Sequence, residues 1–246
     1  ASTAINIGGY LQTPSDVARD YLAEKYGGKR RRVTTKQYHA IMQKRHHPLF
    51  AVAGRYDDAL YVDIKAAYWS IVRIVGWDVD YNPNRWLGQG ESMEDFPYAE
   101  HKLARNCLVT AGLYGNQKIW NAEKKKLITV RRGNALTNYC LWALVQDVLN
   151  AVAFEAIGAG AVYCHTDGFI VERRNLADLM SVIAEWGLTP GIKYEGPAEV
   201  YSAGAYSIGP KRNRRKMFVT RTMHSITYYA DIDWLKPRFR RFALGE

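Results

Sequence analysis

Cysteine is scarce in this chain of 246 residues, which contains only Cys107, Cys140 and Cys164. Their number is odd, and no two of them have CxxC spacing. A disulfide framework and a structural zinc site are therefore both disfavoured. We expect a protein of a reducing compartment.

Long apolar runs are also lacking. No uninterrupted stretch approaches the roughly 18 apolar residues that span a bilayer, and the first residues show no signal-peptide pattern. We expect a soluble, intracellular protein without a membrane partner.

Acidic residues are too few to balance the basic ones. The chain has 24 Asp and Glu against 34 Lys and Arg, which gives a net charge of +10. A protein this basic usually binds a polyanion, and nucleic acid is the first candidate. An anionic membrane surface is less favoured, because no long basic amphipathic helix stands out. The run Lys29–Arg32 is either a solvated loop or a phosphate contact, and we favour the phosphate contact.

The hydrophobic fraction of 48% supports a buried core. The pattern shows no repeat and no low-complexity linker, so we expect one compact body with a basic C-terminal extension. Periodicity and capping residues predict the following elements. Helices are expected at 14–26, 35–44, 65–75, from 98 towards 114, at 136–156 and at 175–186 (capped by Asn175), and strands at 60–63, 127–130, 159–162, 169–171, 191–194 and 199–208.

Two aspartates have similar settings in this pattern. Asp63 ends a short apolar strand, and Asp167 lies in the polar turn between two apolar runs. Each alone would suggest a solvated side chain. Two carboxylates at strand ends in a basic chain, however, are typical of two-metal phosphoryl chemistry, and oxygen ligands favour magnesium.

The residues around these aspartates resemble the family B DNA polymerases, especially the protein-primed branch and its primer-independent relatives. The order and rough spacing of the motifs agree from about Gly54 to Lys211. The similar segments are Tyr61-Val62-Asp63-Ile64-Lys65-Ala66-Ala67-Tyr68-Trp69-Ser70 (first palm motif), Leu113-Tyr114-Gly115 (end of the fingers helix), Tyr163-Cys164-His165-Thr166-Asp167-Gly168 (third motif), and Ile192-Lys193-Tyr194-Glu195 with Ile208-Gly209-Pro210-Lys211 (strand and lysine motif).

The resemblance implies an α+β fold, with a polymerase palm whose antiparallel sheet is flanked by helices, reduced fingers and a remnant thumb. It implies no exonuclease domain. The expected division is an N-terminal helical basic region at 1–53, a palm at 54–210 with a short fingers insertion at about 76–118, and a basic C-terminal extension or thumb remnant at 211–246.

The resemblance also assigns roles to residues. Asp63 and Asp167 would be catalytic and, with the Ile64 carbonyl, would hold Mg²⁺ or Mn²⁺. Tyr68 would lie under the nucleotide sugar and favour deoxynucleotides, although it fits equally well as a core aromatic. Further nucleotide contacts would come from Lys102, Arg105, Tyr114, Gly115 and Lys118, and primer or DNA contacts from His165, Thr166, Lys211, Arg212, Arg214, Arg215, Lys29, Arg30, Arg31 and Arg32.

The chain departs from the family pattern at several positions. His165 replaces the first hairpin aspartate and Gly168 the final serine. Cys107 replaces the fingers lysine that neutralises the triphosphate, and Ala111-Gly112 replaces an Asn-Ser pair. Another cation must then neutralise the triphosphate, and Lys102, Arg105 and Lys118 are the candidates.

The preferred hypothesis is a metal-dependent DNA nucleotidyltransferase that extends a 3′-hydroxyl with dNTPs, with primer-independent initiation and end addition as options. The partners would be primer-template or single-stranded DNA, dNTPs, and a replication protein that supplies a thumb or processivity. The cell would be a bacterial, phage-infected or mobile-element host, with the protein in its cytoplasm. The alternatives are a degenerate palm that binds nucleic acid or a replication partner without catalysis, and a reverse-transcriptase-like polymerase.

Overall fold

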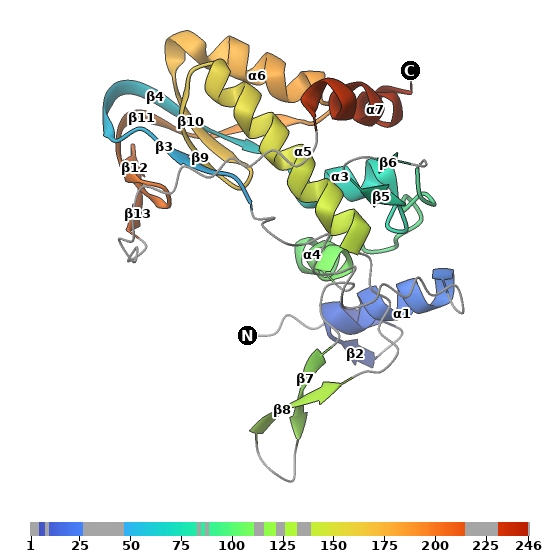
Figure 1. Cartoon of the computed structure of the whole chain (residues 1–246). Helices are drawn as coiled ribbons and strands as arrows, with labels where there is room; N and C mark the ends of the chain where they lie inside the picture. Colours follow the sequence, from blue (N-terminus) through green and yellow to red (C-terminus); the bar gives the residue numbers. More distant parts are fainter. Residues whose placement is uncertain are drawn as a thin grey trace.

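A curled antiparallel sheet of seven strands forms the centre of the molecule (Figure 1). The computed structural model describes residues 5–7, 10–26, 47–82, 85–86, 89–110, 116–121, 126–131, 139–214 and 231–245. From one edge to the other, the strand order is β13 (Lys211–Arg214), β12 (Ala205–Ile208), β11 (Pro190–Ser202), β4 (Gly54–Ile64), β10 (Gly168–Glu172), β9 (Ala161–His165) and β3 (Leu49–Ala51).

Strand β4 shows how the sequence separates the two faces of this sheet. Its alternate residues Leu60, Val62 and Ile64 are buried in the main core, which lies on the helix side. Ala59 and Tyr61, on the other set of alternate positions, belong to a second, smaller apolar cluster. Because side chains alternate along a strand, Asp63 is on the same face as Tyr61, away from the main core.

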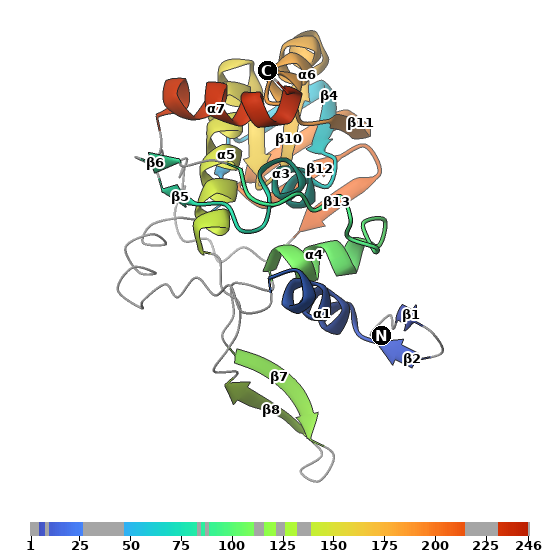
Figure 2. The ribbon, with the colours of Figure 1, turned by 90° about the vertical axis from the view of Figure 1, so that its right-hand side faces the viewer.

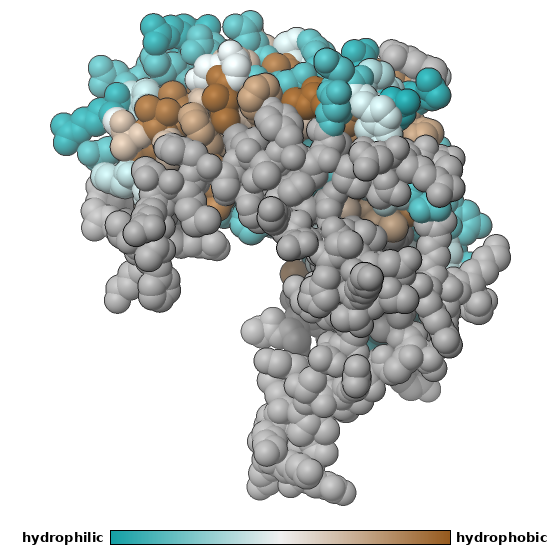
Figure 3. Space-filling model, viewed as in Figure 1, coloured by the Kyte–Doolittle hydropathy of each residue, from teal (hydrophilic) through white to brown (hydrophobic). Residues whose placement is uncertain are grey.

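Three helices cover the main core. α5 (Tyr139–Gly158) packs on β9, and α6 (Leu176–Glu185), preceded by the short 3₁₀ turn Arg173–Asn175, packs on β10 and β11 (Figure 1). α7 (Ile232–Leu244) closes the layer by burying Leu235 and Phe239. On the face shown in Figure 3, hydrophilic residues line the outer edge near α6 and hydrophobic residues show beneath them.

Helix α5 also bears on the question of a membrane span. Within the described residues, Cys140–Gly158 is long and apolar enough to cross a membrane, with a mean hydropathy of 1.5, but 72% of it is buried inside the structure. The sequence analysis considered uninterrupted apolar runs only. This helix is not such a run, because four polar residues lie within it: Gln146, Asp147, Asn150 and Glu155.

The remaining helices lie beyond one end of the sheet. α3 (Ala67–Val75) packs between α4 (Lys102–Thr110), α5 and α7, and α1 (Pro14–Tyr26) packs on α4 (Figures 1 and 2). Thr13 caps α1: its hydroxyl accepts from the Asp16 N–H at 3.2 Å and donates to the Asp16 carboxylate at 2.6 Å. The Thr13 side chain thus satisfies a free N–H at the start of α1.

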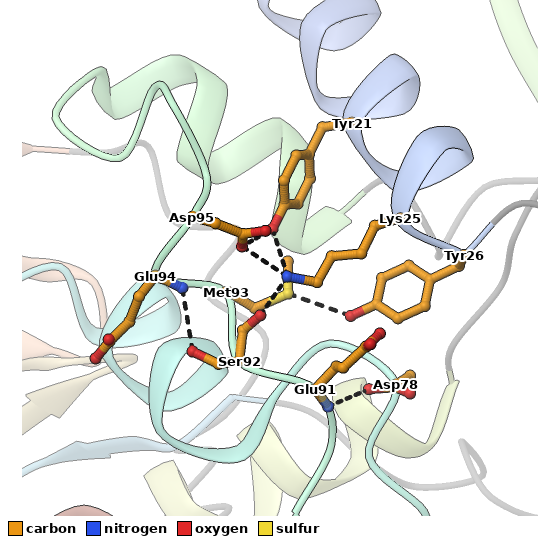
Figure 4. Close-up of polar contacts among 9 residues, drawn as sticks. All are labelled: Tyr21, Lys25, Tyr26, Asp78, Glu91, Ser92, Met93, Glu94 and Asp95. Carbon is orange, nitrogen blue, oxygen red and sulfur yellow. Dashed lines mark hydrogen bonds and ion pairs between the residues drawn. The ribbon is translucent and has the colours of Figure 1, made fainter.

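Lys25 fixes the end of α1 to the chain that leads into α4 (Figure 4). Its ammonium group donates to the Tyr21 hydroxyl at 3.1 Å, the Ser92 carbonyl at 2.5 Å and the Asp95 carboxylate at 2.6 Å. The Tyr21 hydroxyl donates to the same carboxylate oxygen at 2.5 Å. The contacts to Ser92 and Asp95 join residues that are about 70 positions apart, so they hold two distant segments together.

Three small hairpins complete the described chain. They are β1 (Ile5–Ile7) with β2 (Tyr10–Gln12), β5 (Tyr81–Asn82) with β6 (Arg85–Trp86), and β7 (Asn116–Asn121) with β8 (Lys126–Arg131). The β7–β8 hairpin extends away from the rest of the molecule in both views (Figures 1 and 2).

The fold is of the α+β class, as the sequence predicts. That the sheet is a polymerase palm remains a prediction, and so do the domain boundaries. The helix expected from residue 98 begins at Lys102, and the strands expected at 191–194 and 199–208 are the long β11 and β12. Asn175 is at the N-cap position of α6, as predicted, but its side chain makes no capping hydrogen bond. The predicted helix 35–44 lies outside the described residues.

Candidate active site

Asp63 lies near the end of β4 between two glycines. It pairs in register with Gly168 of β10 on one side and with Gly191 of β11 on the other. A Cβ at Gly168 would come within 2.0 Å of the Tyr61 hydroxyl. Tyr61 therefore fills the space that a side chain at position 168 would need.

Asp167 lies in the turn that joins β9 to β10, beside the end of β4. The Asp167 carbonyl accepts a hydrogen bond from the Ile64 N–H at 2.9 Å. The Thr166 N–H donates to the Pro48 carbonyl at 3.0 Å, and Thr166 has a left-handed backbone with φ of 62°. These two bonds hold the strained turn, and they bring Asp167 next to Asp63 although the two are about a hundred positions apart in sequence.

The two carboxylates influence each other. Burial, and after it the charge of Asp63, raises the pKa of Asp167 to about 6. A backbone hydrogen bond and the charges of Lys193 and Lys102 act in the opposite direction. Two carboxylates in a partly buried place repel each other, and a bound cation relieves that repulsion.

The donor atoms at this place fit magnesium or manganese. The Asp63 and Asp167 carboxylates and the Ile64 carbonyl, which the sequence assigns to the metal, are all oxygen donors. Across the described ranges, no group of three or more His, Cys, Asp or Glu side chains gathers in a way that could hold a metal. Phosphate and water oxygens would therefore have to fill the other positions, as they commonly do for Mg²⁺.

Lys193 is a member of the site that the sequence analysis did not single out. Its ammonium group forms an ion pair with the Asp63 carboxylate, which is 15% exposed. In β11, Ile192 pairs with Val62 and Tyr194 pairs with Tyr61, so Lys193 is the extra residue of a β-bulge. A bulge redirects a side chain, and it cannot be read from periodicity. The only signal in the sequence is the motif Ile192-Lys193-Tyr194-Glu195 itself.

Tyr68 lies at the start of α3, after Ala66, whose backbone is left-handed with φ of 48°. Its ring stacks on Trp142 of α5, with centroids 5.7 Å apart and 21° between the planes. Burial raises the pKa of Tyr68 to about 12, and the charge of Asp167 contributes in the same direction. Tyr68 is thus largely a core aromatic that packs against the main core.

Among the residues predicted to contact the nucleotide, Lys102 acts on Asp167 through its charge. It is exposed at the start of α4, and its charge lowers the pKa of Asp167. Arg105 lies one turn further along α4, half-buried. Lys118 is in β7, where only the backbone is described, and Tyr114 and Gly115 lie outside the described residues.

The predicted DNA contacts that the structure describes lie on both sides of the central strand β4. His165, at the end of β9, packs edge-to-face on His47, with ring centroids 5.7 Å apart. Lys211 begins β13 at the opposite edge, where its ammonium group is 5.9 Å from the centre of the Tyr194 ring. Arg212 and Arg214 follow in the β13 backbone. Arg215 and the run from Lys29 through Arg30 and Arg31 to Arg32 lie outside the described residues.

Part of the basic C-terminal stretch is occupied by internal contacts. Lys236 of α7 pairs with Glu155 at 2.9 Å and with Glu185 at 2.8 Å. The Arg238 guanidinium lies 4.5 Å from the centre of the Trp234 ring. Phe239 of the same helix is fully buried and packs in the main core.

Known proteins resemble this chain in structure and not in sequence. No protein-family model matches the chain, and no curated protein sequence matches it. Among solved structures, it is similar to the family B DNA polymerase from the hyperthermophilic archaeon Pyrobaculum calidifontis, with a TM-score of 0.44 and 12% identity. The match covers 79% of this chain and 31% of the polymerase chain, so this chain spans about a third of that protein.

Proposed function

We propose that the protein is a metal-dependent DNA nucleotidyltransferase that adds deoxynucleotides to a 3′-hydroxyl. The observation that carries this proposal is that the carboxylate near the end of β4 (Asp63) lies beside the carboxylate in the turn between β9 and β10 (Asp167). The pairing of Gly168 with Asp63 and the hydrogen bond from Ile64 to Asp167 hold them side by side. Paired carboxylates in a chain with a net charge of +10 suit a phosphate-containing substrate.

Asp63, Asp167 and the Ile64 carbonyl would hold Mg²⁺ or Mn²⁺. When bound, such ions polarise phosphoryl oxygens and lower the pKa of an attacking hydroxyl. The protein's part is to present both carboxylates in the charged form. Because the pKa of Asp167 is about 6 in the protein alone, Asp167 is mostly charged only above that pH.

Lys102 and Lys193 are the cations of this chain that would neutralise the triphosphate. Both lie close enough to lower the pKa of Asp167, and Lys193 contacts Asp63 directly. Fixed positive charge near the reacting phosphates stabilises the charge that develops on them. These two lysines would thus replace the cation that is missing at Cys107. Lys193 would exchange its contact with Asp63 for one with the substrate.

A primer-extension and end-addition assay with Mg²⁺ or Mn²⁺ tests this proposal. Asp63→Asn and Asp167→Asn should each reduce the rate of incorporation by at least about a hundredfold. The matched control is Asp58→Asn, on the same strand, whose carboxylate is exposed and pairs with Arg173. It should retain the activity of the wild type. Activity that survives either substitution at the pair would contradict the assignment.

The second candidate is a degenerate palm that binds nucleic acid without catalysis. The ion pair between Lys193 and Asp63 favours it, because an internal cation there takes the place that a metal would need. This candidate predicts no incorporation on primed, unprimed or single-stranded substrates, together with binding that Asp63→Asn leaves intact. An RNA template in the same assay tests the reverse-transcriptase alternative.

A further inference from the structure

Lys65 follows the last residue of β4, and its backbone is fixed on both sides. Its N–H donates to the Thr189 carbonyl at 2.8 Å, and its carbonyl accepts from the Ser70 hydroxyl at 3.0 Å. The next residue, Ala66, has a left-handed backbone and precedes α3. The start of the Lys65 side chain is therefore held between the residue that precedes β11 and the first turns of α3.

Gly191 leaves room for the stem of this side chain. A Cβ at Gly191 would lie 2.9 Å from the Lys65 Cε and 3.4 Å from its Cγ. Gly191 pairs in register with Asp63, and directly paired residues of neighbouring strands project to the same face of a sheet. The Lys65 stem therefore crosses the same face of the sheet that carries the Asp63 carboxylate.

The charge of Lys65 is available to a ligand. The side chain is exposed, and across the described ranges no carboxylate forms an ion pair with its ammonium group. The Asp63 carboxylate is instead paired with Lys193, which comes from the bulge of β11. Asp63 thus already has a cation, although the Lys65 stem passes beside it.

The cations around the aspartate pair outnumber its carboxylates. Lys65 crosses the sheet beside Asp63, Lys193 pairs with Asp63, and the charge of Lys102 acts on Asp167. Three lysines beside two carboxylates leave an excess of positive charge before any metal binds. Such a place attracts a polyanion, and lysine binds phosphate as a point charge.

We propose that Lys65 is a phosphate-binding residue, and that the bare backbone of Gly191 lets its stem reach across the sheet to the substrate. The phosphate belongs to a nucleoside triphosphate or to a DNA strand. The inference rests on the proposed function, and it adds a cation that can contact phosphate before Lys193 leaves Asp63.

Calorimetric titration of inorganic triphosphate into the full chain, in EDTA and at low ionic strength, tests this proposal without a metal. Lys65→Met retains most of the apolar stem and removes the charge, so it should weaken triphosphate binding about tenfold. The control is Arg73→Met, which removes an exposed charge from α3. It should leave the affinity within about twofold of the wild type.

Gly191→Ala displaces the same lysine and retains its charge. The nearest atom to the added Cβ is close to the end of a flexible side chain, so the Lys65 stem shifts and the backbone stays in place. Triphosphate binding should weaken about threefold, and the melting temperature should change by no more than about 3 °C. The double variant should bind like Lys65→Met alone, because both substitutions act through the same lysine.

Fluorescence anisotropy of the same variants with single-stranded DNA identifies the source of the phosphate. A loss of triphosphate affinity assigns Lys65 to the nucleotide, and a loss of DNA affinity alone assigns it to the strand. Unchanged affinity for both ligands in Lys65→Met would overturn the inference, as would an equal loss in Arg73→Met or a wild type that binds neither ligand.

The two proposals fail separately. If Lys65→Met loses affinity in EDTA but the wild type adds no nucleotide to a primer, the proposed function fails and the inference stands. If the wild type extends a primer and Lys65→Met binds both ligands as the wild type does, the inference fails and the proposed function stands.

Discussion

The Asp167 carboxyl lies among groups that favour its protonated form. Burial and the charge of Asp63 raise its pKa to about 6, against 3.8 for an unperturbed aspartate. Between these two values the folded chain binds more protons than the unfolded chain. Stability therefore falls as the pH rises through this window, and the loss is complete above the folded pKa.

We therefore expect the metal-free protein to lose up to about 3 kcal/mol of unfolding free energy between pH 4 and pH 6 through this one group. Urea denaturation in EDTA measures the loss. The Asp167→Asn variant should lack this contribution, and added Mg²⁺ should stabilise the wild type more at pH 8 than at pH 5. The same pH dependence in the variant would show that another group causes it.

Gly168 yields a second prediction for a single residue. A Cβ at this position would lie 2.0 Å from the Tyr61 hydroxyl, so Gly168→Ser should reduce the unfolding free energy by about 1–3 kcal/mol. Tyr61→Phe should recover part of that loss in the double variant, because it removes the clashing oxygen. Thermal denaturation measures both effects.

Gly158 provides the control for this prediction. It ends α5, and no heavy atom lies within 4 Å of a Cβ built there. Gly158→Ala should leave the stability unchanged or raise it by up to about 1 kcal/mol. A loss at Gly158 as large as that at Gly168 would contradict the steric explanation.

Among the elements, α1 depends most clearly on a contact that lies far away in sequence. Lys25 is 15% exposed and joins α1 to Ser92 and Asp95. Lys25→Met retains most of the apolar stem and removes these bonds. We expect a loss of about 1 kcal/mol, because the Asp95 partner is 63% exposed and is screened by solvent.

Urea denaturation followed by circular dichroism measures this loss. The control is Glu24→Gln, an exposed position on the same helix, which should stay within about 0.5 kcal/mol of the wild type. If Lys25→Met is equally neutral, the contacts in Figure 4 do not hold α1 in place.

At the scale of the whole molecule, the net charge of +10 predicts sequence-independent binding of nucleic acid. Binding of single-stranded DNA should weaken steeply with salt. Replacing Lys29, Arg30, Arg31 and Arg32 by alanine should reduce the slope of log K against log salt by about 0.7 for each phosphate that these side chains neutralise.

Fluorescence anisotropy at several salt concentrations measures this slope. Arg55→Ala is the control, because Arg55 is exposed and pairs with Glu199. It should change the slope little. Affinity that does not depend on salt would indicate a protein partner for the basic surface.

The sequence by itself determined the features that depend on neighbouring residues. The Thr13 cap, the buried helix α5 and the turn at Asp167 follow from side-chain chemistry and apolar periodicity within a few positions. The same local signals singled out Asp63 and Asp167 as candidates.

Only the tertiary structure decided which of these features meet. It placed β10 beside β4, which brings Asp63 next to Asp167. It also put Lys193 in a β-bulge, where the side chain reaches Asp63. Strand order and bulges depend on packing between segments that are far apart in sequence, so no local pattern encodes them.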